Sequence, residues 1–291
     1  MTKSGIQIKA PAKVNVRLEI TGKRPDGYHN IFSIFVPVEL YDYLEITQNS
    51  TGVIRFSTTG GNVPEDSTNL VYMAADSFFE KIRIKNRGID IKLEKNIPVA
   101  AGLGGGSSDA ASTLLALNEM HKFPIEKEEL HKIALKLGAD VPFFLDAVPS
   151  IVTGIGEILE PVPNWPEFWY LIVTPQVEIS TAWVYRNYKM ELTSNEYDYI
   201  RKTLKNDDVI ISDILKNDLE KVTSASFPII PALKRKIMDA GAEGAIMSGS
   251  GPSVFGIFLS REKAVSARDL LMSDDLRHIS AVKGKGIKKA V

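Results

Sequence analysis

Hydrophobic and polar residues partly alternate along the first sixty positions, as they do in strands that bury one face. The β-branched and aromatic runs there are separated by Gly, Pro and Asn. They are GIQIKA (5–10), VNVRLEI (14–20), IFSIFVPVEL (31–40), YDYLEIT (41–47) and VIRFST (53–58). Each run predicts a strand.

The pattern then changes to helical spacing. STNLVYMAADSFFEKI (67–82) places apolar residues three and four positions apart, and Ser67 or Thr68 could cap the helix. Further elements are expected in this order: a strand at 88–96, a helix at 107–120, and a helix at 126–137 that ends at Gly138.

Strands and helices are mixed beyond residue 150. Strands are expected in SIVTGIGEILEPV (150–162), WYLIVTP (169–175), GAIMSG (244–249) and SVFGIFLS (253–260), and helices near 181–189, 212–224, 230–240 and 261–272. Because the elements do not alternate regularly, the pattern favours an α+β fold over a doubly wound parallel sheet. A proline cluster at 161, 163 and 166 predicts a boundary between two domains, residues 1–158 and 159–291.

Composition limits the classes of partner. The 291 residues are 44% hydrophobic and 24% charged, which is typical of a globular protein with one large core or two smaller ones. With 35 basic and 36 acidic residues, no net field favours nucleic acid or anionic membrane. The basic segment KGKGIKK (283–289) is interpreted as a solvated terminus rather than a nucleic-acid patch.

The absence of cysteine excludes disulfides, thiolate metal sites and a cysteine nucleophile. No apolar run approaches the roughly 20 residues of a membrane span, and the first residues resemble no signal or transit peptide. We therefore expect a cytosolic protein with no membrane partner.

PVAAGLGGGSSDAASTLLALN (98–118) is a glycine-rich loop that leads into a helix. It lacks the Gly-Lys-Ser/Thr of a nucleotide-binding P-loop, and Ser107 and Asp109 stand where a dinucleotide fingerprint needs its third glycine. Converging backbone N–H groups and the helix dipole can nevertheless bind phosphate without a lysine. The alternative is a flexible loop before an ordinary capped helix. Asp109 is interpreted as structural or metal-related rather than as a base.

Five stretches together resemble the GHMP kinases in their order and spacing, over nearly the whole chain. They are PAKVNVRLEITGKRPDGYH (11–29), PVAAGLGGGSSDAA (98–111), LGADVPFFL (137–145), GIGEILEPV (154–162) and MSGSGPSVF (247–255). RPDGYH and LGADVPFF are similar to those of members that phosphorylate a cytidyl sugar-alcohol phosphate for isoprenoid-precursor synthesis. Ala100 and Ala101 stand where relatives often carry glycine. The resemblance implies a two-domain α+β kinase with its active site in the interdomain cleft and ATP as co-substrate.

The resemblance also implies residue roles. Lys13 and Asp140 would be the catalytic pair, the carboxylate accepting the hydroxyl proton and the lysine keeping it ionised. The implied ATP-binding residues are Asn69 and Lys95, near adenine, and Pro98, Val99, Ala100, Ala101, Gly102, Leu103, Gly104, Gly105, Gly106, Ser107 and Ser108. Taken singly, Asp140 could be a turn aspartate that caps a backbone N–H, Lys13 a solvated strand-edge lysine, and Asn69 and Lys95 surface residues.

Substrate binding is implied for a second set: Asn15, Tyr28, His29, Ile155, Thr181 and Tyr185. Tyr28 and Tyr185 would stack on cytosine while His29 binds its edge. Asn15 should share a strand face with Lys13, because their positions differ by two. Tyr185 could instead be a core aromatic of a helix. SGSG (248–251) could be a hairpin turn or a loop that closes on the active site.

Magnesium that bridges the ATP phosphates is expected on chemical grounds, with its protein ligands unassigned. His121, His131 and His278 lack the spacing of a zinc site. Two other functions stay open. DGYH argues against a homoserine or mevalonate-type kinase, and an intact Lys13 and Asp140 argue against a non-catalytic nucleotide-binding protein.

Overall fold

The chain forms two compact units, each built from separate segments. The structure is a computed structural model that describes residues 5–190, 197–205 and 209–286. Unit 1 comprises Met1–Ala12, Leu40–Val99 and Gly104–Ala147, and unit 2 comprises Lys13–Glu39, Ala100–Leu103 and Val148–Val291. The domain division at 1–158 and 159–291 stays a prediction.

Strands β1 (Gly5–Lys23) and β2 (His29–Gln48) are long, and each contributes residues to both units. The sequence predicts four separate strands here, and this division is wrong. Pro11 lies between two of the predicted strands but does not end β1, because the fixed φ of proline is compatible with extended backbone and proline lacks only the N–H donor. Pro37 lies inside β2, as it does in the predicted strand at 31–40. The carbonyl of Pro37 still accepts a hydrogen bond from the Lys285 N–H, at 2.8 Å.

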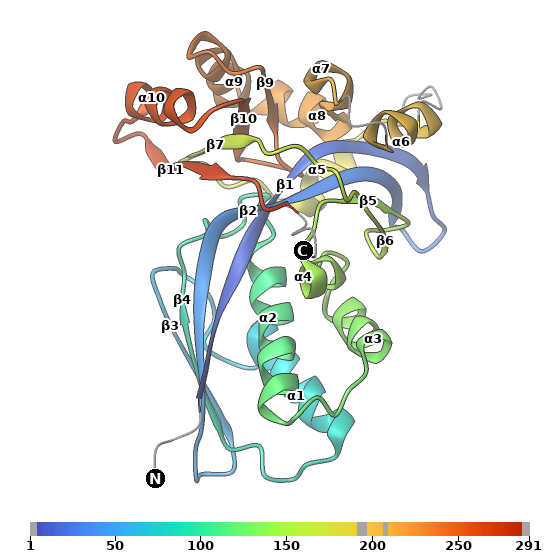
Figure 1. Ribbon diagram of the computed structural model, residues 1–291, viewed down its shortest axis with the longest axis vertical. Helices are drawn as coiled ribbons and strands as arrows, with labels where there is room; N and C mark the ends of the chain where they lie inside the picture. The colour runs from blue at the N-terminus through green and yellow to red at the C-terminus, as the bar shows by residue number, and fades with distance from the viewer. Residues whose placement is uncertain (1–4, 191–196, 206–208, 287–291) are drawn as a thin grey trace. The chain divides into compact units, whose positions relative to one another are not determined.

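Unit 1 combines strands with a group of helices. Its end of β2 pairs antiparallel with β4 (Ile89–Glu94), which pairs parallel with β3 (Ile54–Thr59). Figure 1 shows the helices of this unit gathered on one side of these strands. They are α1 (Leu70–Ile82), α2 (Gly105–Met120), α3 (Lys127–Leu137) and α4 (Val141–Asp146).

The helix ends in unit 1 follow local hydrogen bonding. The predicted helices at 107–120 and 126–137 are confirmed as α2 and α3, and α3 ends at Gly138. Helix α1 is capped by Asn69, whose Oδ1 accepts from the Val71 N–H at 2.9 Å, so the predicted Ser67 or Thr68 cap is wrong. The Thr68 hydroxyl instead donates to Asp66.

A four-stranded antiparallel sheet forms the centre of unit 2. Its strand order is β11–β7–β10–β9, and α9 (Ile229–Asp239) and α10 (Arg261–Leu271) pack on it (Figure 1). The strands are β7 (Trp169–Pro175), β9 (Gly244–Met247), β10 (Val254–Phe258) and β11 (Leu276–Lys283). Buried residues such as Leu171, Val254 and Ile237 form the core between sheet and helices.

The remaining elements of unit 2 are short. The predicted strand at 150–162 is a hairpin, β5 (Ser150–Thr153) and β6 (Ile158–Pro161). The predicted helix at 212–224 is interrupted, because Lys216 and Asn217 pair with β1. The elements around it are α5 (Thr181–Asn187), α6 (Tyr197–Lys205), α7 (Ile211–Ile214), β8 (Lys216–Asn217) and α8 (Asp218–Ser226).

The C-terminal strand β11 corrects another expectation. Lys283 pairs with Trp169, and the Gly284 N–H donates to Phe168 O at 3.0 Å. The first residues of the predicted solvated segment 283–289 are therefore part of the fold, because strand pairing satisfies their backbone. Residues 287–289 lie outside the described ranges.

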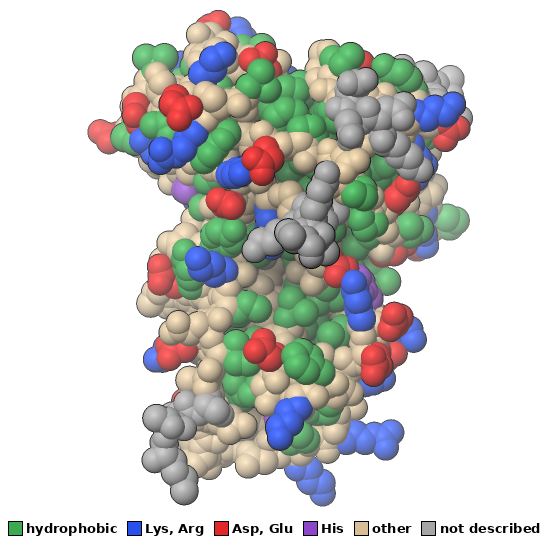
Figure 2. Space-filling view, viewed as in Figure 1, with side chains coloured by type: hydrophobic (Ala, Val, Ile, Leu, Met, Phe, Trp, Pro, Cys, Tyr) green, Lys and Arg blue, Asp and Glu red, His purple; other side chains and the backbone are tan. Residues whose placement is uncertain are grey.

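The mixture of sheets and helices confirms the α+β class. Acidic and basic side chains are interspersed over the surface that Figure 2 shows, in keeping with a net charge of −1. Among the described residues, no helix is long and apolar enough to cross a membrane.

Gly256 in β10 allows α9 to pack closely on the sheet. A Cβ there would lie 2.3 Å from Ile237 Cγ2 and 3.1 Å from Ala242 Cβ. We expect Gly256→Ala to lower the free energy of unfolding by about 1–3 kcal/mol, the cost of overpacking. Urea titration measures this. Gly286→Ala is the matched control, because nothing lies within 4 Å of its Cβ position. Equal stability of the two variants would contradict this account of the packing.

Candidate active site

The glycine-rich loop connects the end of β4 with α2. Gly102 and Gly104 adopt left-handed backbone, with φ of +75° and +71°, which glycine tolerates without strain. Ala100 has φ +52°, so this alanine takes a conformation that favours glycine. Gly104 is the N-cap of α2 and has no capping side chain. The first N–H groups of α2 are therefore oriented as an anion-binding helix terminus requires.

A second loop, residues 248–251, contacts the glycine-rich loop. A Cβ on Gly102 would lie 2.2 Å from Ser248 O, so only glycine fits there. Ser248 Oγ donates to Gly102 O at 2.8 Å and accepts from the Asn15 N–H at 3.2 Å. Met247 and Val254 pair across β9 and β10, so this segment is also their hairpin connection. The hairpin interpretation of SGSG is therefore confirmed, and its closing on an active site stays a prediction.

Lys13 and Asn15 share a face of β1, as predicted. The Lys13 ammonium donates to Asn15 Oδ1 and lies 4.4 Å from the centre of the Phe35 ring. Asn15 Nδ2 donates to Ser33 Oγ at 3.2 Å. Lys13 is only 3% exposed, so it is not a solvated strand-edge lysine. Its backbone N–H donates to Leu103 O at 2.9 Å, which joins β1 directly to the glycine-rich loop.

Asp140 lies between α3 and α4 and is partly buried. It occupies the N-cap position of α4, but its side chain makes no capping hydrogen bond. Asp140 is therefore not a side-chain cap of α4. Asp140 belongs to unit 1 and Lys13 to unit 2, and their pairing stays a prediction.

Two of the residues implied for cytosine binding lie together in unit 2. The rings of His29 and Tyr185 are 5.4 Å apart with an interplanar angle of 37°. Tyr185 also packs against the core of unit 2, as the alternative of a core aromatic expects, and its stacking on cytosine stays a prediction. Tyr28 is 59% exposed on the turn before β2. Asp26 holds this turn by accepting from the Tyr28 N–H at 3.1 Å and from Arg24 Nε at 2.9 Å.

Ile155 and Thr181 each make a hydrogen bond within unit 2. Ile155 lies in the β5–β6 turn, where its N–H donates to Glu157 Oε2 at 2.6 Å. Thr181 begins α5, and its hydroxyl lies 2.8 Å from that of Ser250 in the second loop. Their contact with substrate stays a prediction.

Asn69 and Lys95 both have protein partners. Besides capping α1, Asn69 donates from Nδ2 to Pro64 O at 2.8 Å. Lys95 is buried, so the surface alternative is wrong for this residue, and its Nζ donates to Asp42 and, at 2.8 Å, to Asp109. Their role near adenine stays a prediction.

Burial dominates the electrostatics of this cluster. It raises the pKa of the Asp109 carboxyl to about 8; the charge of Asp42 adds to the increase and the Lys95 ammonium opposes it. Burial alone would lower the pKa of Lys95, but the two carboxylates outweigh it and raise that pKa. Lys95 therefore stays charged. The buried contact of Asp109 with Lys95 supports its structural interpretation, and a role in metal binding stays a prediction.

Ser108 Oγ and Asp109 Oδ1 are buried and have no hydrogen-bond partner among the described residues. Orphaned buried oxygens are rare, and they fit an additional ligand such as a hard cation. Within the same residues no group of three or more His, Cys, Asp or Glu side chains could hold a metal ion. A cation bound there would take most of its ligands from a bound molecule or from water and not from side chains of these types.

Sequence reasoning missed two residues that shape the site. Asp42 accepts a hydrogen bond from the Asn96 N–H, just before the glycine-rich loop. The sequence could have identified it, because this acid shares the buried face of β2 with Leu44 and Ile46. Asn217 supports the second loop by donating to Met247 O and Gly249 O, both at 2.8 Å. No local pattern identifies Asn217, because its partners lie in another element.

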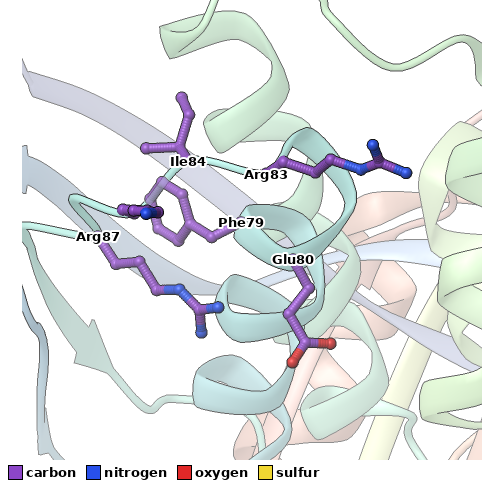
Figure 3. Close-up of a pocket in the computed structure, with 6 residues that line it drawn as sticks. Phe79, Glu80, Arg83, Ile84 and Arg87 are labelled. Carbon is purple, nitrogen blue, oxygen red and sulfur yellow. The ribbon is translucent and has the colours of Figure 1, made fainter.

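A separate cavity of about 430 Å³ opens beside the end of α1 (Figure 3). Three of its six lining residues are basic, and one of these, Arg87, is paired with Asp76. The lining residues are Phe79, Glu80, Arg83, Ile84, Lys85 and Arg87. None of the predicted site residues is among them.

Comparison with known proteins matches both parts of the chain to one family. The model of the GHMP kinases N terminal domain matches residues 69–147, and that of the GHMP kinases C terminal matches residues 199–272. The first match includes the glycine-rich loop and Asp140.

Relatives align over nearly the full chain. A 4-diphosphocytidyl-2-C-methyl-D-erythritol kinase from Geotalea daltonii is 43% identical, over 96% of this chain and 98% of the relative. One from Alkaliphilus metalliredigens is 40% identical, over 91% and 92%. A crystal structure of 4-(cytidine 5'-diphospho)-2C-methyl-D-erythritol kinase matches with a TM-score of 0.82 at 33% identity, over 97% of this chain and all of that one. A homoserine kinase from Cytophaga hutchinsonii shares the fold, with a TM-score of 0.77 at 21% identity.

The contact between His29 and Tyr185 generates a prediction about pH. Burial, and then the charge of Lys23, lower the pKa of His29 from the ordinary value of 6.5, so its ring is neutral at pH 7. Because the pKa is lower in the folded than in the unfolded chain, stability is lost as pH falls below about 6.5. We expect Tyr185→Ala to expose the ring and raise this pKa, as measured by NMR titration with His29→Gln to assign the signal. An unchanged pKa would show that Tyr185 does not shield His29.

Proposed function

Since the chain belongs to the GHMP kinases, in the family of the 4-diphosphocytidyl-2-C-methyl-D-erythritol kinases, we propose that it transfers the γ-phosphoryl group of ATP to the 2-hydroxyl of 4-diphosphocytidyl-2-C-methyl-D-erythritol. This reaction belongs to the non-mevalonate route to isopentenyl diphosphate. The observation that carries the proposal is the 43% identity to such a kinase over 96% of this chain.

The glycine-rich loop is the proposed ATP-phosphate site. Phosphoryl transfer has a loose transition state, so the protein acts mainly by positioning groups and stabilising charge. Backbone N–H groups at Gly105 and Gly106, with the dipole of α2, supply positive potential where a P-loop would use a lysine. The left-handed backbone at Gly102 and Gly104 lets the polyphosphate approach these groups.

The proposed chemistry at the acceptor uses Asp140 and Lys13. Asp140 would take the proton of the 2-hydroxyl as the new P–O bond forms. The buried Lys13 ammonium would stabilise negative charge on the attacking oxygen. Asn15 orients that ammonium by accepting its hydrogen bond.

Magnesium is the expected companion of ATP, and the chain offers it a suitable oxygen. The buried Ser108 hydroxyl has no partner among the described residues and would be one oxygen ligand of the ion. Bound there, magnesium would neutralise charge on the phosphates.

Cytidine recognition is proposed for His29, Tyr28 and Tyr185. A neutral imidazole can both donate and accept hydrogen bonds, which suits the edge of cytosine. Tyr185 already packs beside His29, and the exposed Tyr28 ring is available to stack on the other face of the base. Stacking of one base contributes about 1–3 kcal/mol.

The function is tested by ATP consumption with and without the cytidyl substrate. We expect turnover with 4-diphosphocytidyl-2-C-methyl-D-erythritol and almost none with methylerythritol phosphate, although the reacting hydroxyl is the same. Binding energy from the remote cytidine positions the alcohol, so its removal lowers kcat as well as affinity. Homoserine and mevalonate serve as control substrates. Equal turnover of the truncated substrate would refute cytidyl recognition and leave only a general GHMP kinase.

Asp140→Asn tests the catalytic pair. We expect ATP affinity to stay near that of the wild type while kcat falls by about 10²–10⁴, the usual cost of losing a general base. Asp146→Asn is the matched control, because Asp146 ends α4 and pairs with the exposed Lys127. Near-normal kcat in Asp140→Asn would remove this residue from the mechanism.

A further inference from the structure

Three buried charged residues form a continuous chain of contacts within unit 1. Lys95 Nζ donates to Asp42 Oδ2 and to Asp109 Oδ2. Asp42, Lys95 and Asp109 are 0%, 3% and 2% exposed at their side chains. We call these three residues the loop clamp. Neither the family match nor the proposed phosphate site explains why three charges are buried here.

The loop clamp joins the two ends of the glycine-rich loop. Asp42 Oδ1 accepts from the backbone N–H groups of Asn96 and Ile97, at 2.6 and 2.8 Å, immediately before the loop begins. Asp109 lies in the second turn of α2, where the chain has just left the loop. Lys95 Nζ bridges these two anchors, so it fixes the entry and the exit of the loop relative to each other.

Lys95 of the loop clamp lies close to Gly105, the first residue of α2. A Cβ on Gly105 would lie 3.1 Å from Lys95 Nζ and 3.0 Å from Ile97 Cγ2. The N–H groups proposed to bind phosphate therefore belong to backbone that rests on Lys95. A shift of the ammonium would move these donors.

We propose that Lys95, held by Asp42 and Asp109, is a positioning residue that preorganises the glycine-rich loop for the phosphates of ATP. The inference rests on the proposed function of that loop. In this role Lys95 acts through the backbone of Asn96, Ile97 and the first turns of α2, without itself touching the phosphates.

Two physical arguments favour positioning over other roles. Replacing a buried ion pair by apolar residues is often neutral or stabilising, so stability alone is a weak reason for this cluster. Because Lys95 stays charged and burial raises the pKa of Asp109, the three side chains sum to a net charge between 0 and −1, so they offer no positive charge to attract a polyanion. The benefit to ATP must then come from geometry, because a loop that is already ordered loses less entropy on binding.

A matched pair of substitutions at Asp109 tests the inference. Asn has nearly the volume of Asp and keeps an oxygen that can accept from Lys95, whereas Leu has the same branching at Cγ, is larger and has no acceptor. We expect Asp109→Leu to weaken ATP binding about tenfold, or about 1.4 kcal/mol. Asp109→Asn should stay within about twofold of the wild type, and in both variants kcat at saturating ATP and KM for the cytidyl substrate should change by less than about threefold.

Further variants separate the loop clamp from folding and from metal binding. Lys95→Met/Asp109→Leu removes a charge pair together, is expected to fold, and should lose ATP affinity like Asp109→Leu. Calorimetry with ATP alone and with magnesium ATP should show the same loss, since a metal-ligand effect would vanish without the ion. Arg55→Met is the control, because it breaks the exposed ion pair with Asp90 on β3 and β4 and should leave ATP affinity unchanged.

Unchanged ATP affinity in a folded Asp109→Leu variant would overturn the inference. An equal rise in the KM of both substrates, parallel to a fall in Tm, would also overturn it, because it indicates general destabilisation. Failure of the wild type to bind ATP would refute the proposed function first and the inference with it. Wild-type binding with unaffected variants would refute the inference alone.

Discussion

Two backbone segments far apart in the sequence approach so closely at Gly102 that no side chain fits between them. This approach sets the position of Ser248, whose hydroxyl links the carbonyl of Gly102 to the N–H of Asn15. Lys13 is fixed in turn, because its N–H donates to the neighbouring Leu103. Three segments of unit 2 are thereby held as one body, and a shift of any of them would displace groups proposed to act on both substrates.

The parts of the fold that depend on local pattern could be predicted from the sequence. Helices α2 and α3 follow from apolar spacing and, for α3, from Gly138 at its end. Continuity of β1 through Pro11 could not be predicted, because proline weakens a strand locally and only neighbouring segments show that it is tolerated. The strand β8 has two residues and exists because it pairs with β1, so no local signal marks it.

The candidate site divides in the same way. Strand periodicity alone places Asn15 beside Lys13, and the hydrogen bond between their side chains confirms it. The contact of His29 with Tyr185 joins distant segments, and only the family resemblance suggested that both serve one base. For Asp42 the sequence indicates burial but not a partner, since Lys95 and Asp109 come from other elements. Contacts between elements are what the sequence leaves undetermined.

Unit 2 is built from segments that are far apart in the sequence, and this has a consequence for synthesis on the ribosome. This unit takes Lys13–Glu39 from near the N-terminus and its last strand, β11, from residues Leu276–Lys283. Strand β7 lies between β10 and β11, so one of its edges stays unpaired until nearly the whole chain has emerged. Contacts of such sequence separation form slowly, and an exposed strand edge can pair with other chains. Until β11 is available, the unpaired edge of β7 is therefore a site at which a nascent chain can associate with another.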